Sequence, residues 1–285
     1  MKKIYLQTLP LFILLFSCNS KPNYDVISEM NNIAPIEIVY IDEKTINEIG
    51  SFPIDRKYYA QAIEQIEKGN PKYIILKFFF DTTSSSDIAL SEVLKKYGNI
   101  LTQTTIHTDT TCSKSIVENL KISLNQYTNS SMDSIHLLLP NDVLINDFIG
   151  IGHVDFLIRN SKSITLPIIE QIDGVVIPSL ALKIGMLISN MDPIISDEMV
   201  ILGESEILLE RKMLKLKISK PGFYKSLSFI DVLKSEVETG EFHNKVIIIF
   251  VDFESVRNVQ TVYDSPHNYA EIVADSINTV LINMK

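Results

Sequence analysis

The first hundred residues alternate short apolar runs with amphipathic segments, and this pattern restricts the fold more than any other feature of the chain. Between the apolar runs, Asp55 is placed to cap a helix that extends to about residue 68, and Asp87 to cap one that extends to about residue 97. Strands that alternate with helices pair in parallel through right-handed crossovers, so the pattern predicts an α/β fold. The runs with the length of buried strands are 36–41 (IEIVYI), 73–80 (YIILKFFF) and 100–104 (ILTQT).

The rest of the body extends this pattern into a single domain over residues 35–285. We expect a mainly parallel sheet with helices on both faces, plus one antiparallel hairpin over 207–210 and 213–218, where LKLKI alternates apolar and basic residues. Residues 105–134 are rich in Thr, Ser and Asn, which predicts a loop with one helix near 114–123. Further strands are expected at 135–139, 152–158, 164–169 and 246–251, and further helices at 178–189, 228–235 and 268–284.

Residues 1–17 have the pattern of a signal peptide. Lys2 and Lys3 precede an apolar run that is shorter than the ~20 residues needed to cross a bilayer as a helix. The run ends in LFSC, a leucine three positions before Cys18, and this resembles the lipobox of bacterial lipoproteins. The alternative is an ordinary signal peptide with an incidental cysteine.

Cleavage before Cys18 would leave a lipid-bearing cysteine at the head of a polar tether over residues 18–34. Asn19 fits onward export, so we expect a lipid anchor in the outer membrane, facing the periplasm. Cys112 then has no intrachain disulfide partner. The chain has 26 basic against 35 acidic residues, so nucleic acid is not an expected partner.

The sequence contains no familiar catalytic or cofactor signature. The motifs GxSxG, HExxH, GxGxxG and CxxC and a Walker loop are all missing. The histidines at 107, 136, 153, 243 and 267 lie far apart without the spacing of metal ligands. We therefore expect no catalytic residues, no metal and no cofactor.

Acidic residues follow several predicted strands, at the sheet edge where α/β proteins bind ligands. They are Asp42 and Glu43, Asp81 in the loop 81–86, and Asp252. Lys77 stands out because it interrupts an apolar strand. If the first two strands are neighbours, Asp42 could form an ion pair with Lys77. The alternative places Lys77 on an edge strand, where it reaches water.

Several segments of the chain carry a resemblance to a known family when they are taken together. They are IVYIDEKTINEIGSFPIDRKYYAQAIEQI, YIILKFFFDTTSSSDIALSEVLKKYGNIL, GHVDFL, IPSLALKIG, LSFIDVLKSEVETGEFHNKVIIIF and AEIVADSINTVL. Together they resemble the second class of CHASE domain, the cyclase and histidine-kinase associated sensory extracellular domain. The resemblance covers about residues 36–285 and keeps the order of the family's segments. It implies a sensory domain of the kind found outside the cytoplasmic membrane in bacterial kinases and cyclases.

The chain departs from the family's usual pattern in three segments. FPIDR at 52–56 stands where the family has Trp-Pro-Trp-Pro-Arg, so Pro53 and Arg56 are kept. Leu76-Lys77 replaces a common Phe-Asp pair, and FVD at 250–252 replaces Ile-Gly-Ala or Ile-Gly-Thr. If the lost acid helped to form a pocket, Lys77 has either closed that pocket or changed its charge preference.

We interpret the chain as a non-enzymatic sensory or ligand-binding lipoprotein of the cell envelope. The sequence stops at Lys285 without an output domain, so we expect it to act through an unknown small molecule or an envelope protein. The alternatives are a structural adaptor, favoured by a large apolar patch, and an envelope hydrolase that uses strand-end carboxylates. The expected ligand-binding residues are Asp42, Arg56, Lys77, Asp81, His153 and Asp155.

Overall fold

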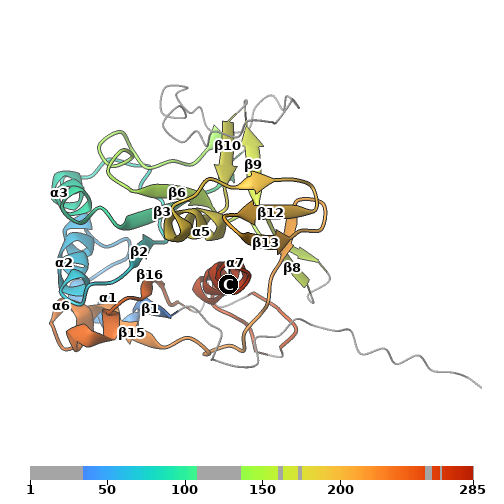
Figure 1. Ribbon diagram of the computed structural model, residues 1–285. Helices are drawn as coiled ribbons and strands as arrows, with labels where there is room; N and C mark the ends of the chain where they lie inside the picture. The colour runs from blue at the N-terminus through green and yellow to red at the C-terminus, as the bar shows by residue number, and fades with distance from the viewer. Residues whose placement is uncertain are drawn as a thin grey trace, which may run out of the picture.

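The computed structural model describes residues 35–107, 136–159, 163–172, 175–253, 259–263 and 265–284. Its centre is a sheet of six parallel strands, as the sequence pattern predicts (Figure 1). Their order across the sheet is β15 (Ser226–Ser228), β1 (Ile36–Ile41), β16 (Val246–Val251), β2 (Tyr73–Leu76), β3 (Ile100–Thr104) and β6 (Gly150–His153).

Helices cover both faces of this sheet, which confirms the predicted α/β architecture (Figure 1). One face carries the short helix α1, the crossover helices α2 and α3, and α6. The other face carries α5 and α7, which pack against each other. The bounds are α1 (Glu43–Ile49), α2 (Arg56–Glu67), α3 (Asp87–Tyr97), α5 (Leu180–Ser189), α6 (Phe229–Leu233) and α7 (Tyr269–Ile282), with a 3-10 turn η3 (Thr239–Phe242) before β16.

Alternate residues of each strand enter two separate hydrophobic cores. On β2, Ile75 packs beneath α5 and α7, whereas Ile74 and Leu76 pack beneath α2 and α3. Because both faces are covered, the strands are apolar almost throughout, which is why they could be recognised from composition. A polar residue at the end of such a strand is therefore informative about function.

Side-chain caps set the start of the main helices. Asp55 accepts a hydrogen bond from the Lys57 amide at 2.9 Å and caps α2, as expected. Asn268 and Glu271 form a capping box at the start of α7. The predicted cap of α3 is wrong by one residue: Ser86 is the cap, and Asp87 is the first helical residue.

Short antiparallel sheets are added around the parallel one. They have the orders β14-β8-β7, β11-β12-β13, β10-β9 and β4-β5. The bounds are β4 (Ile106–His107), β5 (His136–Leu137), β7 (Leu157–Arg159), β8 (Ser163–Pro167), β9 (Ile169–Ile172), β10 (Val175–Pro178), β11 (Ile194–Ile195), β12 (Met199–Leu202), β13 (Ser205–Leu208) and β14 (Met213–Lys215).

The prediction that the strands at 207–210 and 213–218 pair with each other as a hairpin is wrong. Strand β13 pairs with β12 and strand β14 pairs with β8, so the two strands share only the isolated bridge between Glu210 and Met213. Alternation of apolar and polar residues shows that a strand has one wet face, but it does not identify the neighbouring strand.

Other differences concern boundaries. Helix α1 was not expected, and β2 ends at Leu76, four residues earlier than predicted. The expected strands 152–158 and 164–169 are each divided, into β6 and β7 and into β8 and β9. The helix predicted near 114–123 lies outside the described residues. Within the described parts of the chain, no helix has the length and apolar character needed to span a membrane.

Candidate functional site

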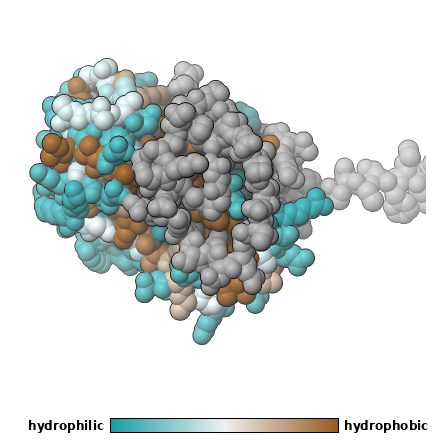
Figure 2. Space-filling view, turned by 90° about the horizontal axis from the view of Figure 1, so that it is seen from above, coloured by the Kyte–Doolittle hydropathy of each residue, from teal (hydrophilic) through white to brown (hydrophobic). Residues whose placement is uncertain are grey.

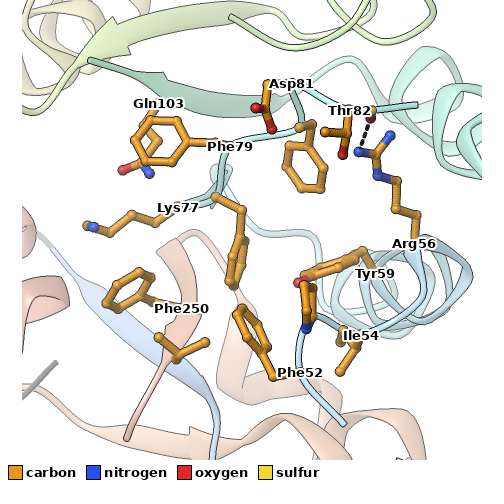
Figure 3. Close-up of a pocket in the computed structure, with 14 residues that line it drawn as sticks. Phe52, Ile54, Arg56, Tyr59, Lys77, Phe79, Asp81, Thr82, Gln103 and Phe250 are labelled. Carbon is orange, nitrogen blue, oxygen red and sulfur yellow. Dashed lines mark hydrogen bonds between the residues drawn. The ribbon is translucent and has the colours of Figure 1, made fainter. Parts of the chain in front are cut away.

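A pocket of about 430 Å³ opens at the carboxyl edge of the parallel sheet, beside the ends of β2, β3 and β16 (Figure 3). Its volume falls within the range of small-molecule sites, and its position agrees with the general location of ligands in parallel sheets. Polar groups come from Arg56, Lys77, Asp81 and Gln103. Six of the fourteen lining residues are aromatic: Phe52, Tyr59, Phe78, Phe79, Phe80 and Phe250.

Strand register brings three of these residues to one face of the sheet. Leu76 is paired with Ile249 on β16 and with Thr102 on β3. Lys77, Phe250 and Gln103 each lie one position further along their strands. They therefore project from the same face at adjacent strand ends, on the side covered by α7.

The aromatic residues form a connected wall around Phe78. The ring centroids of Tyr59 and Phe78 lie 5.0 Å apart, and those of Phe78 and Phe250 lie 6.0 Å apart. Phe52 contacts Phe78 at 6.3 Å from the segment that leads into α2. Edge-to-face and tilted packing of this kind holds the rings in place. Phe52 and Phe79 are each 40% exposed, so their rings are accessible to an apolar ligand.

Lys77 is buried in this aromatic surrounding and is 4% exposed. Its Nζ lies 3.8 Å from the centroid of the Phe250 ring and 4.1 Å from that of Tyr269. Among the described residues, no carboxylate lies within ion-pair distance of this ammonium. Burial lowers the pKa of Lys77 from 10.5 to about 7, because the low-polarity site disfavours the charged form.

Gln103 is the other buried polar residue at this end of the pocket. It is 3% exposed, and its Oε1 atom has no hydrogen-bond partner in the structure. Buried polar atoms are nearly always paired in folded proteins, so an unpaired carboxamide oxygen on a pocket wall indicates a place for a ligand or a water molecule.

Arg56 lines the pocket but is already held by protein groups. Its guanidinium forms an ion pair with Asp87 and donates to the carbonyl of Thr82, and it lies 5.3 Å from the centroid of the Phe80 ring. Asn141 donates to the same Asp87 carboxylate at 3.1 Å. The ion pair fixes the start of α2 against the start of α3 and leaves little free positive charge on Arg56.

Asp42 does not take part in the pocket. Its carboxylate accepts hydrogen bonds from the Thr45 amide at 2.9 Å, from the Thr45 hydroxyl at 2.7 Å and from Ser228 at 2.9 Å. An ion pair between Asp42 and Lys77 was expected only if β1 and β2 were neighbours in the sheet. This premise is wrong, because β16 lies between β1 and β2, and the two side chains do not form an ion pair.

His153 and Asp155 lie at the end of β6, outside the pocket lining. His153 is fully buried, with its Nδ1 3.8 Å from an oxygen of Asp155, and burial lowers its pKa to about 3. Asp155 accepts a hydrogen bond from Thr105. Of the six expected residues, the structure thus brings Arg56, Lys77 and Asp81 to one pocket and places the other three elsewhere; a ligand-binding role remains a prediction for each of them.

Gln103 and the aromatic wall were not singled out from sequence. A glutamine inside an otherwise buried strand (ILTQT) is a signal comparable to Lys77, and strand order would have been needed to place Phe250 beside it. No metal site is formed by the described residues, since no group of three or more His, Cys, Asp or Glu side chains converges there.

The fold and pocket define a parallel α/β domain with a small-molecule-sized site at the carboxyl edge of its sheet. The chain matches the family model of the CHASE2 domain over residues 7–285, and it therefore belongs to the CHASE2 family of extracellular sensory domains. No curated protein and no solved structure matches it.

The segments that depart from the usual family pattern meet in this pocket. Phe52, Pro53 and Ile54 from the first segment, Lys77 from the second, and Phe250 and Val251 from the third all line it. A pocket of about 430 Å³ is present beside Lys77, and a change in its charge preference remains a prediction.

Proposed function

We propose that this CHASE2 domain is the ligand-binding body of a non-enzymatic sensory lipoprotein of the cell envelope. The observation that carries the proposal is the pocket at the sheet edge, with its aromatic wall and with Lys77 and Gln103 buried at one end. The CHASE2 family supports a sensory role outside the cytoplasm.

A hydrolase that works through paired carboxylates is less consistent with the side chains. Asp81 is the single acidic residue among the described lining residues, and Asp42 and Asp87 are engaged in hydrogen bonds or an ion pair. General acid and base chemistry needs two such groups within reach of one substrate.

An adaptor role would rest on a large apolar surface patch. Figure 2 shows hydrophobic side chains in separate groups among hydrophilic ones over the described part of the face in view. The pocket is therefore the feature on which we base the function.

The anchoring part of the proposal rests on the sequence. Residues 1–17 would be removed as a signal peptide, and Cys18 would carry the lipid that holds residues 35–285 at the membrane through the tether. Asn19 supports the outer membrane, with the domain facing the periplasm.

Native mass spectrometry of the full chain, purified from its own host, tests the sensory role. We expect a retained small molecule that is lost in Phe79→Ala, because Phe79 is a partly exposed wall of the pocket. Ile88→Ala, which removes an exposed apolar side chain on α3, is the matched control and keeps the molecule. Retention that is equal in both variants, or no retained molecule at all, would contradict the proposal.

A further inference from the structure

Two polar side chains share one end of the pocket without a hydrogen-bond or ion-pair partner among the described residues. Lys77 and Gln103 come from adjacent strand ends, and Figure 3 shows them one above the other on the same side, with the Phe250 ring beyond Lys77. Neither side chain forms a hydrogen bond or ion pair with a described residue, although the backbone amide of Lys77 donates to the carbonyl of Ile249. Both can donate: the lysine through its ammonium, the glutamine through its carboxamide N–H groups.

Burying these two side chains without hydrogen-bond partners lowers the stability of the folded protein. A buried ammonium and a buried carboxamide lose their hydration, and the flanking rings of Phe250 and Tyr269 return only part of that loss through cation–π contacts. An acceptor that carries a negative charge would restore the charged form of Lys77, and it can also accept from the carboxamide N–H groups of Gln103.

The remaining charges limit the size of that negative charge. Arg56 is neutralised by Asp87, and the carboxylate of Asp81 also lines the pocket. Lys77 is then the one cation among the described lining residues without a carboxylate partner, and a single cation in a pocket that also contains an acidic residue matches a monoanion better than a phosphate dianion. The aromatic wall requires that the rest of the ligand be apolar.

We propose that the pocket binds a small monocarboxylate with an apolar body, its carboxylate at Lys77 Nζ and the Gln103 carboxamide and its body against Phe52, Phe78 and Phe79. This inference rests on the proposed function, since it names the ligand class of the same site. Binding is non-covalent, and the carboxylate accepts hydrogen bonds from both residues.

Three probes with one apolar body separate the charge preference from general apolar binding. They are 3-phenylpropionate, its neutral amide 3-phenylpropionamide, and the cation 3-phenylpropylamine. Equilibrium dialysis of each labelled probe measures its dissociation constant with the full chain, as its host produces it, in lipid nanodiscs. We expect 3-phenylpropionate to bind at least tenfold more tightly than either analogue.

The variant Lys77→Met replaces the side chain with an unbranched apolar one that is one atom shorter, and it removes the charge. Because it also removes a buried ammonium, the variant is expected to fold at least as well as the parent. The matched control is Lys72→Met, since Lys72 is exposed just before the amino end of β2, at the opposite end of the strand from the pocket. We expect Lys77→Met to abolish the preference for 3-phenylpropionate and Lys72→Met to keep it.

Equal binding of the three probes, or a preference for 3-phenylpropylamine, would overturn the monocarboxylate assignment while leaving a ligand-binding pocket. Binding of none of them would also overturn the monocarboxylate assignment. The sensory function would then be tested separately, by whether native mass spectrometry finds a retained ligand. A preference for 3-phenylpropionate that survives in Lys77→Met would show that the carboxylate lies elsewhere.

Discussion

Lys77 shows how one side chain can oppose the stability of the fold that contains it. Its pKa is about 7 in the folded protein and near 10.5 when solvated, so the folded state binds fewer protons between these values. The free energy of unfolding must therefore rise as pH increases from about 7 to about 10.5. Below pH 7 the lysine is charged in both states, and burial of the ammonium lowers the free energy of unfolding by its full amount.

Lys77→Met is accordingly expected to stabilise the protein at pH 6, by roughly 2 kcal/mol after the lost cation–π contacts are counted. The gain should shrink towards zero near pH 10.5, where lysine is neutral in both states. Urea unfolding at pH 6, 8 and 10 measures it, with Lys72→Met as the exposed control. A variant that is no more stable than the parent at pH 6 would show that Lys77 is not penalised by burial.

At the scale of elements, the ion pair of Arg56 and Asp87 joins the first turns of α2 and α3 beside the pocket. Both side chains are buried, and Asp87 also accepts from the Ser84 amide at 2.8 Å. Removing one partner leaves the other charged and without compensation, so Asp87→Asn should lower the free energy of unfolding by about 3 kcal/mol.

A double-mutant cycle checks this coupling. Asp87→Asn combined with Arg56→Met should cost less than the sum of the single changes, because the stranded guanidinium is gone. Glu64→Gln is the surface control: Glu64 pairs with Lys96 at 3.3 Å with both side chains about half exposed, and its loss should cost less than about 1 kcal/mol. Equal costs for Asp87→Asn and Glu64→Gln would contradict the structural role of the buried pair.

The packing of β6 against α5 provides a second test of element geometry. A Cβ atom on Gly152 would lie 2.5 Å from the Cα of Leu180 and 2.6 Å from its backbone nitrogen, so strand and helix would have to separate. Gly152→Ala should therefore destabilise the fold by about 2 kcal/mol or more.

Gly150→Ala is the matched control on the same strand. Its Cβ would meet the Cε of Lys183 at 2.7 Å, and a flexible side chain can move aside. We expect a loss below about 1 kcal/mol for this variant in thermal or urea unfolding. A ranking in which Gly150→Ala is the more damaging change would refute the close approach of β6 and α5.

The same scale explains how much could be predicted from sequence. Strands 36–41, 100–104 and 246–251 were found with their observed bounds because both of their faces are buried. Lys77 could be predicted because it interrupts an apolar run, and Asp81 because it follows that run. The order of the strands was not recoverable, since β16 enters between β1 and β2 from more than 150 residues away in the sequence. For that reason the Asp42–Lys77 pair failed and Phe250 was missed.

At the scale of the whole molecule, the proposed lipid anchor at Cys18 would hold the domain at the envelope. The sequence predicts removal of residues 1–17 and attachment of lipid to the Cys18 thiol. Cys18→Ser keeps the size of the side chain but removes the thiol that would carry the lipid. We expect the parent chain to incorporate an alkyne-labelled fatty acid and the variant to incorporate none.

Cys112→Ser is the matched control, because it makes the same change at the second of the two cysteines. It should keep the label, and the intact mass of the parent should correspond to a chain that starts at Cys18 and carries lipid. A parent without lipid mass, or equal labelling of Cys18→Ser and Cys112→Ser, would mean that residues 1–17 act as an ordinary signal peptide. The sensory domain would then be exported without this anchor, and the proposal that its pocket binds a ligand would be unaffected.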